Sequence, residues 1–429
     1  MSSLKVLIIG GGIGGPALAF WLAHLGHKVT VVERSPSLRA QGQQIDIRGQ
    51  GVGVIRRMGI EPAIRSHGVD EAGLRFVDKN HKQQAVFMAN KSGKGRQSFT
   101  SEFEIMRGDL VRILFDATKE LGVEYVFGAT IESFEQDDES VTVRLSNGST
   151  GTYDLLVGAD GQSSRTRRLM LGPGAKDPFY SFNVHTALFT VPKAEVDDNL
   201  ATVCICTKKR VMFTRNDNPR TTQAYFILAP DEETHKLLAD AERKRDVQEQ
   251  KQLWIELFKD AGWQVPRFIK ELEMGGVSDD FYSVEVGQVR LDKWYKNRVV
   301  LLGDAGYTPS PMTGRGTTSA FVGAYVLAGE ISKRCSGSSG SDGIAAAVEA
   351  YDKAMRPFME NVQDIPYRPA SLYPNSQWGV TVANTLLWLV STLRIDKIGQ
   401  WLRSDDVQGW KLPEYPGLVS HEAKGTKLV

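Results

Sequence analysis

The feature that most constrains the fold is a glycine-rich turn between two apolar runs near the N-terminus. An apolar run at residues 6–9 precedes Gly10, Gly12 and Gly15, which have the spacing GxGxxG. In a strand–turn–helix unit, these glycines allow a tight turn, a close approach of the backbone to a pyrophosphate, and close helix–strand packing. The free N–H groups at the helix start then bind the phosphates. The sequence therefore predicts a dinucleotide-binding βαβ unit.

Glu33 indicates which dinucleotide this unit holds. It ends the second apolar run, about 20 residues after the glycine turn, where a carboxylate accepts hydrogen bonds from ribose hydroxyls. A carboxylate repels a 2′-phosphate, so the site should hold FAD or NAD rather than NADP. The alternative is a chance glycine-rich turn, which the complete order of strand, helix, strand and acid disfavours.

The chain of 429 residues is longer than one hydrophobic core usually supports, so more than one packed unit is expected. Long β-type segments follow the first part, and a buried-type strand with a helix then returns. This order indicates that the nucleotide-binding domain is interrupted by a second domain. We expect an α/β protein with a nucleotide-binding domain in two parts, 1–175 and 286–365, around a sheet domain at 176–285. Strands within 73–105 are candidates to join the inserted sheet. Residues 366–429 should form a C-terminal helix and tail.

Composition excludes several classes of partner. The net charge of +1 provides no electrostatic attraction for nucleic acid or an anionic membrane. The three cysteines, Cys204, Cys206 and Cys335, form no CxxC pair and argue against a disulfide scaffold. Cys204 and Cys206 share one face of a strand and are predicted to pack in a core, and no metal site is expected. We expect a reducing, cytoplasmic location, because the first strand leaves no room for a signal peptide.

Two further strand-to-helix crossings carry a carboxylate at the strand end. One is Asp160 in "LLVGADGQSSRTRR" and the other is Asp304 in "RVVLLGDAGY". Ligands of open α/β sheets bind at such strand ends, so either acid could reach a bound nucleotide. The N–H groups of Gly316 and Thr317, at the start of a later helix, could face an anionic ring. Taken alone, each acid could instead be a local turn cap.

Together these motifs resemble the flavin-dependent aromatic hydroxylases, which are single-component FAD monooxygenases. The resemblance rests on GxGxxG with its late acid, ADGxxSxxR and GDAxxxxxPxxGxG, in that order, over roughly residues 4–365. The stretches "GQQIDIRG", "RGDLV" and "GDAGYTPSPMTGRGTTSAFVGAYVLAGEI" are most similar to the tetracycline-inactivating branch. The resemblance implies a Rossmann-like FAD-binding domain with an inserted β-sheet substrate domain and a C-terminal helix.

The resemblance also implies roles for individual residues. The positions that match FAD contacts in the family are Gly10, Gly12 and Gly15 (pyrophosphate), Glu33 (adenosine ribose), Asp46 (flavin), Arg107 (bracing FAD), Asp304 (ribityl chain), and Gly316 and Thr317 (backbone near the isoalloxazine). Asp160 belongs to a motif that supports FAD and the reduced nicotinamide, and Arg39 matches a position linked with NADPH. The family's GDAAH is GDAGY here, with Tyr307, and Arg315 replaces a common glutamine. These departures should affect the movement of the flavin and the pocket entrance rather than FAD binding.

The chemistry implied by the resemblance is carried by the flavin, without a catalytic side chain or a metal. NADPH binds transiently and reduces FAD, O₂ adds at the flavin C4a, and the hydroperoxide transfers oxygen to an aromatic or polycyclic phenolic small molecule. His24 and His27 are therefore interpreted as surface residues, and His185 as a core or sheet residue. The alternatives are a flavin epoxidase or Baeyer–Villiger-type oxygenase on the same fold, and an FAD-binding protein without turnover.

The substrate pocket is expected between the inserted sheet and the loop 309–316. Because the strand phase cannot be read from one sequence, alternate members of the candidate set are expected to point away from the pocket. The candidate lining residues are Met212, Phe213, Tyr225, Phe226, Pro311 and Met312.

The segment 378–402 predicts an apolar C-terminal helix. Its uncharged part is shorter than the ~20 apolar residues of a membrane span, which argues against membrane association. The positions Val382, Leu386, Leu389 and Leu393 form a stripe on one helical face, with Trp378, Trp388 and Trp401 near it. We expect this stripe to be buried at the mouth of the substrate cavity. In the branch that the chain resembles, such a helix bridges the two domains and helps to gate the cavity.

Overall fold

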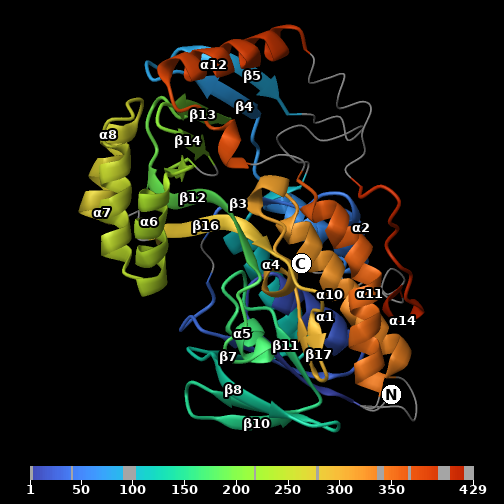
Figure 1. Cartoon of the computed structure of the whole chain (residues 1–429). Helices are drawn as coiled ribbons and strands as arrows, with labels where there is room; N and C mark the ends of the chain where they lie inside the picture. Colours follow the sequence, from blue (N-terminus) through green and yellow to red (C-terminus); the bar gives the residue numbers. More distant parts are fainter. Residues whose placement is uncertain are drawn as a thin grey trace.

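The computed structural model describes residues 3–39, 42–89, 103–216, 219–276, 280–335, 343–365, 369–394 and 406–419. They form two parts that lie side by side (Figure 1). The part with the predicted dinucleotide unit is called the nucleotide-binding layer, and the sheet expected to bind the substrate is called the substrate sheet. Each has its own hydrophobic core.

The nucleotide-binding layer is built on a six-stranded sheet with the order β17-β18-β11-β1-β2-β7. The glycine turn leaves its central strand, because β1 pairs in parallel with both β2 and β11. The strands are β1 (Lys5–Ile9), β2 (Lys28–Glu33), β7 (Glu124–Phe127), β11 (Leu155–Gly158), β17 (Tyr295–Lys296) and β18 (Val299–Leu301). The predicted Rossmann-like βαβ unit is confirmed.

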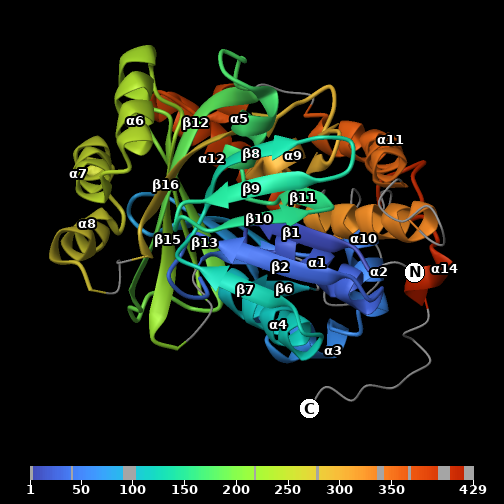
Figure 2. The same ribbon diagram turned by 90° about the horizontal axis from the view of Figure 1, so that it is seen from below.

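Helices pack beside this sheet, and a smaller three-stranded sheet, β10-β9-β8, lies alongside (Figure 2). The longer helices are α1 (Gly14–His24), α4 (Arg107–Glu120), α10 (Gly316–Arg334) and α11 (Ile344–Gln363). The shorter helices are α2 (Gln50–Arg57), α3 (Glu61–Ser66), α5 (Arg165–Leu171), α9 (Asp304–Tyr307) and α14 (Pro416–Val419). The small sheet contains β8 (Ile131–Gln136), β9 (Val141–Leu145) and β10 (Thr150–Tyr153), and a ribbon pairs β3 (Gln44–Asp46) with β6 (Glu104–Met106).

The substrate sheet has seven strands in the order β16-β12-β15-β14-β13-β4-β5. Its strands are β4 (Gly73–Val77), β5 (Gln83–Met88), β12 (Phe179–Pro192), β13 (Leu200–Cys206), β14 (Arg210–Arg215), β15 (Thr221–Leu228) and β16 (Tyr282–Val289). Strands β4 and β5 come from the N-terminal part of the chain and extend the sheet at its far edge. The boundary expected at residue 285 falls inside β16.

Three helices cover one face of the substrate sheet (Figure 1): α6 (Glu232–Lys244), α7 (Val247–Phe258) and α8 (Val265–Met274). Alternate residues of β12, such as Ala187 and Phe189, fill the core beneath these helices. Cys204 and Cys206 also lie in this core, with their sulfur atoms 3.8 Å apart, so their predicted packing role is confirmed. The opposite face of the sheet is turned toward the nucleotide-binding layer.

The C-terminal helix α12 (Gln377–Thr392) packs in a way that the sequence did not predict. It lies against β5 and β13, and the Ser391 side chain hydrogen-bonds the backbone of Val86. The helix buries Val380 and Asn384, whereas the whole predicted stripe is exposed: Val382, Leu386, Leu389 and Leu393. The expectation that this stripe is buried at the cavity mouth is therefore wrong. Trp401 lies outside the described residues.

Two short 3₁₀ turns are also present, η2 (Pro311–Thr313) and η4 (Pro369–Leu372). Within the described part of the chain, no helix is long and apolar enough to cross a membrane. His24 is half-buried and His27 is buried, and the His27 Nδ1 accepts a hydrogen bond from the Leu4 N–H at 3.2 Å. The interpretation of His27 as a surface residue is wrong, because the helix end folds back onto β1.

Candidate functional site

The glycine turn between β1 and α1 has no room for side chains at two of its positions. Gly10 has φ +118°, and a Cβ atom there would lie 2.2 Å from the carbonyl oxygen of Ala159. A Cβ atom on Gly15 would lie 2.0 Å from the Gly10 carbonyl oxygen. The turn thus approaches the end of β11 and the start of α1 at distances that only glycine allows, as the fingerprint predicts.

Glu33 lies at the mouth of this turn, at the end of β2. Its Oε2 accepts a hydrogen bond from the Gly11 N–H at 2.9 Å, and its Oε1 accepts one from the Ser35 N–H at 2.9 Å. The carboxylate is half-buried. It is therefore held in one orientation beside the turn, where its remaining lone pairs can accept hydrogen bonds from a ribose.

Arg107, the first residue of α4, crosses the glycine turn. A Cβ atom on Gly12 would lie 3.4 Å from its terminal nitrogen, and one on Gly42 would lie 3.0 Å from its Cδ. Burial lowers the pKa of Arg107, while the nearby carboxylates of Glu33 and Asp304 raise it. The guanidinium thus lies beside the glycine turn and close enough to Asp304 to interact with its charge. Its role in bracing FAD stays a prediction.

Asp304 begins α9, where many protein atoms surround its carboxyl group. This environment raises the pKa of the carboxyl group, and Arg107 partly opposes that effect. The residue is nevertheless exposed to solvent and does not pack in the core. Among the described residues, none donates a hydrogen bond to this carboxylate. A solvent-exposed acceptor without a protein donor is a group that a ligand hydroxyl can satisfy.

The start of α10 is open as well. The first N–H groups of a helix have no partner within it, and a Cβ atom on Gly316 would meet no atom within 4 Å. Thr318 fixes the neighbouring loop: its hydroxyl accepts a hydrogen bond from the Arg48 N–H at 2.9 Å. Asp46 in that loop pairs with Arg48 at 2.9 Å, and its buried Oδ1 has no hydrogen-bond partner among the described residues. Asp46 lies near this helix start, because a Cβ atom on Gly314 would be 3.8 Å from its Oδ2.

Asp160 has a different arrangement, because its carboxylate caps α5. It accepts hydrogen bonds from the Ser164 hydroxyl at 2.5 Å, the Arg165 N–H at 2.8 Å and the Thr166 N–H at 3.0 Å. Arg167 follows and is almost fully buried; it donates to the carbonyl oxygens of Ala305 and Gln162 at 2.9 and 2.7 Å. The motif therefore holds the start of α5 in place, and Arg167 connects it to the crossing after β18.

A basic cleft of about 640 Å³ opens beside the Asp160 motif. The described residues place five cationic side chains around it: Arg34, Arg165, Arg168, Lys176 and Arg245. Arg39, on the segment after β2, is exposed and lies outside this set; its guanidinium lies 5.8 Å from the ring centre of Tyr282. Sequence reasoning missed the cleft, because α6 supplies Arg245 from a distant part of the chain.

The substrate sheet separates the predicted pocket residues into two groups. Met212 and Phe226 are fully buried beneath the helices, and the ring of Phe226 stacks on that of Phe258 at 4.2 Å. These two are the alternate members that point away from the expected pocket. Phe213 and Tyr225 lie on the opposite face, with ring centres 5.0 Å apart. The period of two along a strand makes this division necessary.

The other pocket candidates belong to the loop before α10. Met312 packs against Val184 and Val286 of the sheet, whereas Pro311 is exposed. The preceding Ser310 is buried and has φ +81°, an uncommon conformation for a residue with a side chain. Tyr307 is buried in the core, where its hydroxyl hydrogen-bonds that of Tyr351 at 2.7 Å. The expectation that Tyr307 alters the pocket entrance is therefore wrong.

A buried ionic network connects the substrate sheet to the nucleotide-binding layer. Arg215 of β14 pairs with Glu71 at 2.9 Å and Glu104 at 3.0 Å. Burial lowers the pKa of Arg215, but the two carboxylates outweigh burial and hold it above its ordinary value. Gln44 of β3 donates to Glu104 at 2.7 Å. The sequence offered no signal for this network, because its members are scattered along the chain.

The chain matches known flavoproteins over most of its length. The family described as FAD binding domain matches residues 3–364. The FAD-dependent monooxygenase asL4 of Sarocladium schorii is 42% identical, over 98% of this chain and 100% of that protein. The flavin-dependent monooxygenase eupH of Phoma sp is 42% identical, over 97% of this chain and 99% of that protein. The solved structure of tetracycline destructase Tet(55) is 30% identical and has a TM-score of 0.71, over 96% and 99% of the two chains.

Proposed function

Because the chain belongs to the FAD-binding family and is a flavin-dependent monooxygenase, we propose that it hydroxylates an aromatic or polycyclic phenolic compound. NADPH and O₂ are the proposed co-reactants. The observation that carries the proposal is a set of open groups near the glycine turn: the exposed Asp304 carboxylate without a protein donor, Arg107 close to it, and the open start of α10. When bound there, FAD would take electrons from NADPH and pass one oxygen atom of O₂ to the substrate.

The residues at the glycine turn, at the end of β2 and at the two helix starts fit FAD. The glycine turn and the start of α1 would hold the pyrophosphate, and Glu33 the adenosine ribose. Asp304 would accept hydrogen bonds from the ribityl hydroxyls, and Arg107 would offset its charge. The N–H groups of Gly316 and Thr317 would stabilise negative charge on the flavin ring. Asp46, with its open buried oxygen, is the proposed acceptor for a flavin donor.

NADPH has no second nucleotide-binding fold here among the described residues, so the proposal requires a surface site for it. The basic cleft supplies one, because guanidinium groups bind phosphate through paired hydrogen bonds. Asp160 supports this site by holding the start of α5, which carries Arg165 and Arg168. Arg39 remains a proposed contact for the nicotinamide nucleotide on its way to the flavin.

The substrate would lie between the loop 309–316 and the sheet face that carries Phe213 and Tyr225. Aromatic side chains offer stacking surfaces for a planar substrate, and Met312 adds an adaptable apolar contact. These groups would exclude water and position the ring carbon that receives oxygen. The identity to a tetracycline destructase supports polycyclic phenols as the substrate class.

A substrate screen tests the proposed function. The purified FAD-loaded protein is incubated with NADPH, O₂ and phenols, anthraquinones or tetracyclines. We expect at least one compound to accelerate NADPH oxidation and to gain one oxygen atom by mass spectrometry. NADPH oxidation that produces only hydrogen peroxide with every compound would contradict the proposed substrate class.

A charge reversal tests the proposed NADPH site separately. Arg168→Glu should raise KM for NADPH about tenfold or more, equivalent to ~1.4 kcal/mol, while the FAD content stays unchanged. Arg112→Glu, on an exposed part of α4 outside the cleft, is the matched control. Equal KM values for the two variants would exclude the cleft as the site of NADPH binding.

A further inference from the structure

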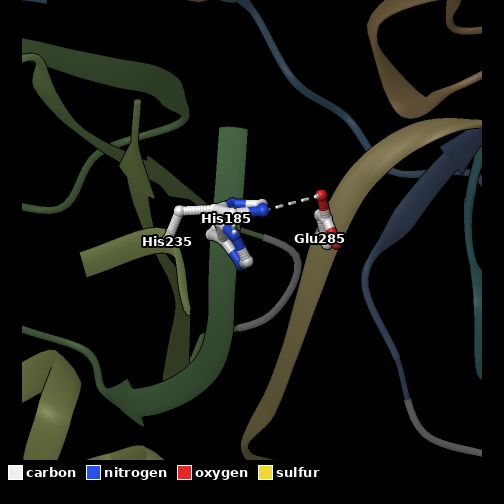
Figure 3. A group of neighbouring side chains, drawn as sticks. All are labelled: His185, His235 and Glu285. Atoms are coloured by element: carbon white, nitrogen blue, oxygen red, sulfur yellow. Dashed lines mark hydrogen bonds and ion pairs between the residues drawn. The ribbon is translucent and has the colours of Figure 1, made fainter. Parts of the chain in front are cut away.

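His185, His235 and Glu285 form a compact cluster at the edge of the substrate sheet. They come from three elements, β12, α6 and β16, and their side chains point toward one another (Figure 3). One ligand atom from each lies within 4.8 Å of the other two. His185 and Glu285 are direct neighbours across the β12–β16 pair, so the sheet register itself sets two of the three positions.

A second carboxylate orients His185. The Nδ1 of this fully buried ring lies 3.1 Å from Glu242 Oε1. That oxygen also accepts a hydrogen bond from the Ser283 hydroxyl at 2.8 Å, and Ser283 Oγ accepts one from the Trp254 indole at 2.9 Å. Because a carboxylate only accepts, Nδ1 carries the proton and the His185 Nε2 presents a lone pair.

That lone pair faces His235, whose Nδ1 lies 3.0 Å away and donates to it. On the other side of the His235 ring, Nε2 lies 3.8 Å from Glu285 Oε1. This Glu285 oxygen is buried and has no hydrogen-bond partner among the described residues. A cation between the two atoms would satisfy the buried oxygen.

We propose that His185, His235 and Glu285 bind a divalent transition-metal ion, for which zinc is the representative probe. Two imidazoles and one carboxylate form a ligand set that zinc accepts, with water as a fourth ligand. The Glu242–His185 hydrogen bond is the outer-shell arrangement that holds metal-binding histidines in the correct tautomer. Ligands of a tetrahedral zinc lie about 3.3 Å apart. The ion would take the lone pair of His185 Nε2 in place of its hydrogen bond with His235, so the His235 ring must turn and the side chains must shift by about 1 Å.

The location indicates a structural role. The ion would hold α6 against β12 and against the edge strand β16. The backbone carbonyl of Glu285 accepts a hydrogen bond from Gln162 of the Asp160 motif at 2.9 Å. On the same strand, Tyr282 lies beneath the Arg39 guanidinium. Metal binding would thus stabilise the junction between the substrate sheet and the nucleotide-binding layer, independently of the proposed hydroxylation.

Zinc titration of the full-length, tag-free, FAD-loaded protein tests this site. After treatment with a chelator and its removal, Zn²⁺ is added in competition with a chromophoric chelator, and Tm is measured in parallel. We expect one zinc ion per chain and a rise in Tm. His235→Ala and Glu285→Gln should each weaken binding at least 100-fold and abolish the rise in Tm, because each removes one of three protein ligands.

Two further variants separate a metal site from general destabilisation. Glu242→Gln should keep the stoichiometry and weaken zinc binding about 10- to 100-fold, because it alters only the partner of His185. His67→Ala, at an exposed histidine beyond α3, should bind zinc like the wild type. Zinc binding that is equal in the wild type and His235→Ala would overturn the proposal. Stabilisation by acid without any response to zinc would overturn it too, and would assign the cluster to an ion pair between protonated His235 and Glu285.

Discussion

The two strand-to-helix crossings that carry Asp160 and Asp304 are alike in sequence and different in space. Each acid follows a buried strand of the same sheet, and each stands beside a glycine. The Asp160 carboxylate accepts hydrogen bonds from the first residues of α5. The Asp304 carboxylate receives none from the described residues, and the residue is exposed to solvent.

From this difference we expect Asp160 to serve the structure and Asp304 to serve ligand binding. A capped carboxylate stabilises the folded chain, because it satisfies N–H groups that the helix leaves open. An exposed carboxylate without protein donors is hydrated in the ligand-free protein, and a ligand that supplies donors can replace that water. We therefore expect substitutions at the two acids to separate ligand binding from stability.

The largest effect is expected from Asp304→Ala. If the carboxylate binds two ribityl hydroxyls, each hydrogen bond to a charged group contributes about 1.5–3 kcal/mol. FAD affinity should fall by about 100-fold or more, while the FAD-free protein stays folded. Flavin absorbance after gel filtration measures the retained FAD. An unchanged FAD content would make Asp304 a second structural residue and erase the contrast with Asp160.

Glu33→Arg should weaken FAD binding nearly as much. The change removes the proposed acceptor of the ribose hydroxyls and places a cation beside the Gly11 N–H that Glu33 now binds. A loss of about 2–4 kcal/mol in FAD binding is expected, from hydrogen bonds to a charged group. Equilibrium dialysis against FAD measures it, with Glu132→Arg on the exposed face of β8 as the control. Equal affinities in the two variants would show that the glycine turn binds FAD without this acid.

Asp160→Ala should have the opposite profile. Removing the acceptor of the α5 start should lower the free energy of unfolding by about 1–3 kcal/mol. Urea unfolding at saturating FAD measures the change, and the FAD affinity of the folded fraction should stay near that of the wild type. A large loss of FAD affinity without a loss of stability would place Asp160 in direct contact with the cofactor.

The smallest effect is a pH dependence of the FAD-free protein. The folded-state pKa of Asp304 is raised by burial, so the folded chain binds more protons than the unfolded chain between the two pKa values. Stability should fall as pH rises from the unfolded pKa through the folded pKa, and then level off. Asp304→Asn should remove this slope and should be more stable than the wild type above that interval. Urea unfolding from about pH 4.5 to about pH 7.5 measures both curves; identical slopes would contradict the assignment.

Sequence and structure agree where the signal is local. The glycine turn, the acid at the end of β2 and the helix start at Gly316 follow from residues that are close along the chain. The family resemblance rested on these motifs, and the match over residues 3–364 confirms it. The sequence left open whether Asp160 caps a helix or contacts a ligand, and its hydrogen bonds show that it caps α5.

Agreement ends where a residue depends on distant partners. The alternation of strand residues predicted that part of the pocket set would point away, but only the structure shows that Met212 and Phe226 do so while Phe213 and Tyr225 lie on the opposite face. The C-terminal stripe predicted to be buried is exposed, because α12 packs through Val380 and Asn384.

By itself, the sequence determined the dinucleotide fold, because a positive φ and a missing Cβ are requirements of single residues in one short turn. Only the tertiary structure decided which carboxylate stays open, which sheet face meets the nucleotide-binding layer, and that His185, His235 and Glu285 meet. The physical reason is that side-chain direction and burial are set by packing between segments far apart in the chain. Such packing leaves no periodic or adjacent pattern in the sequence.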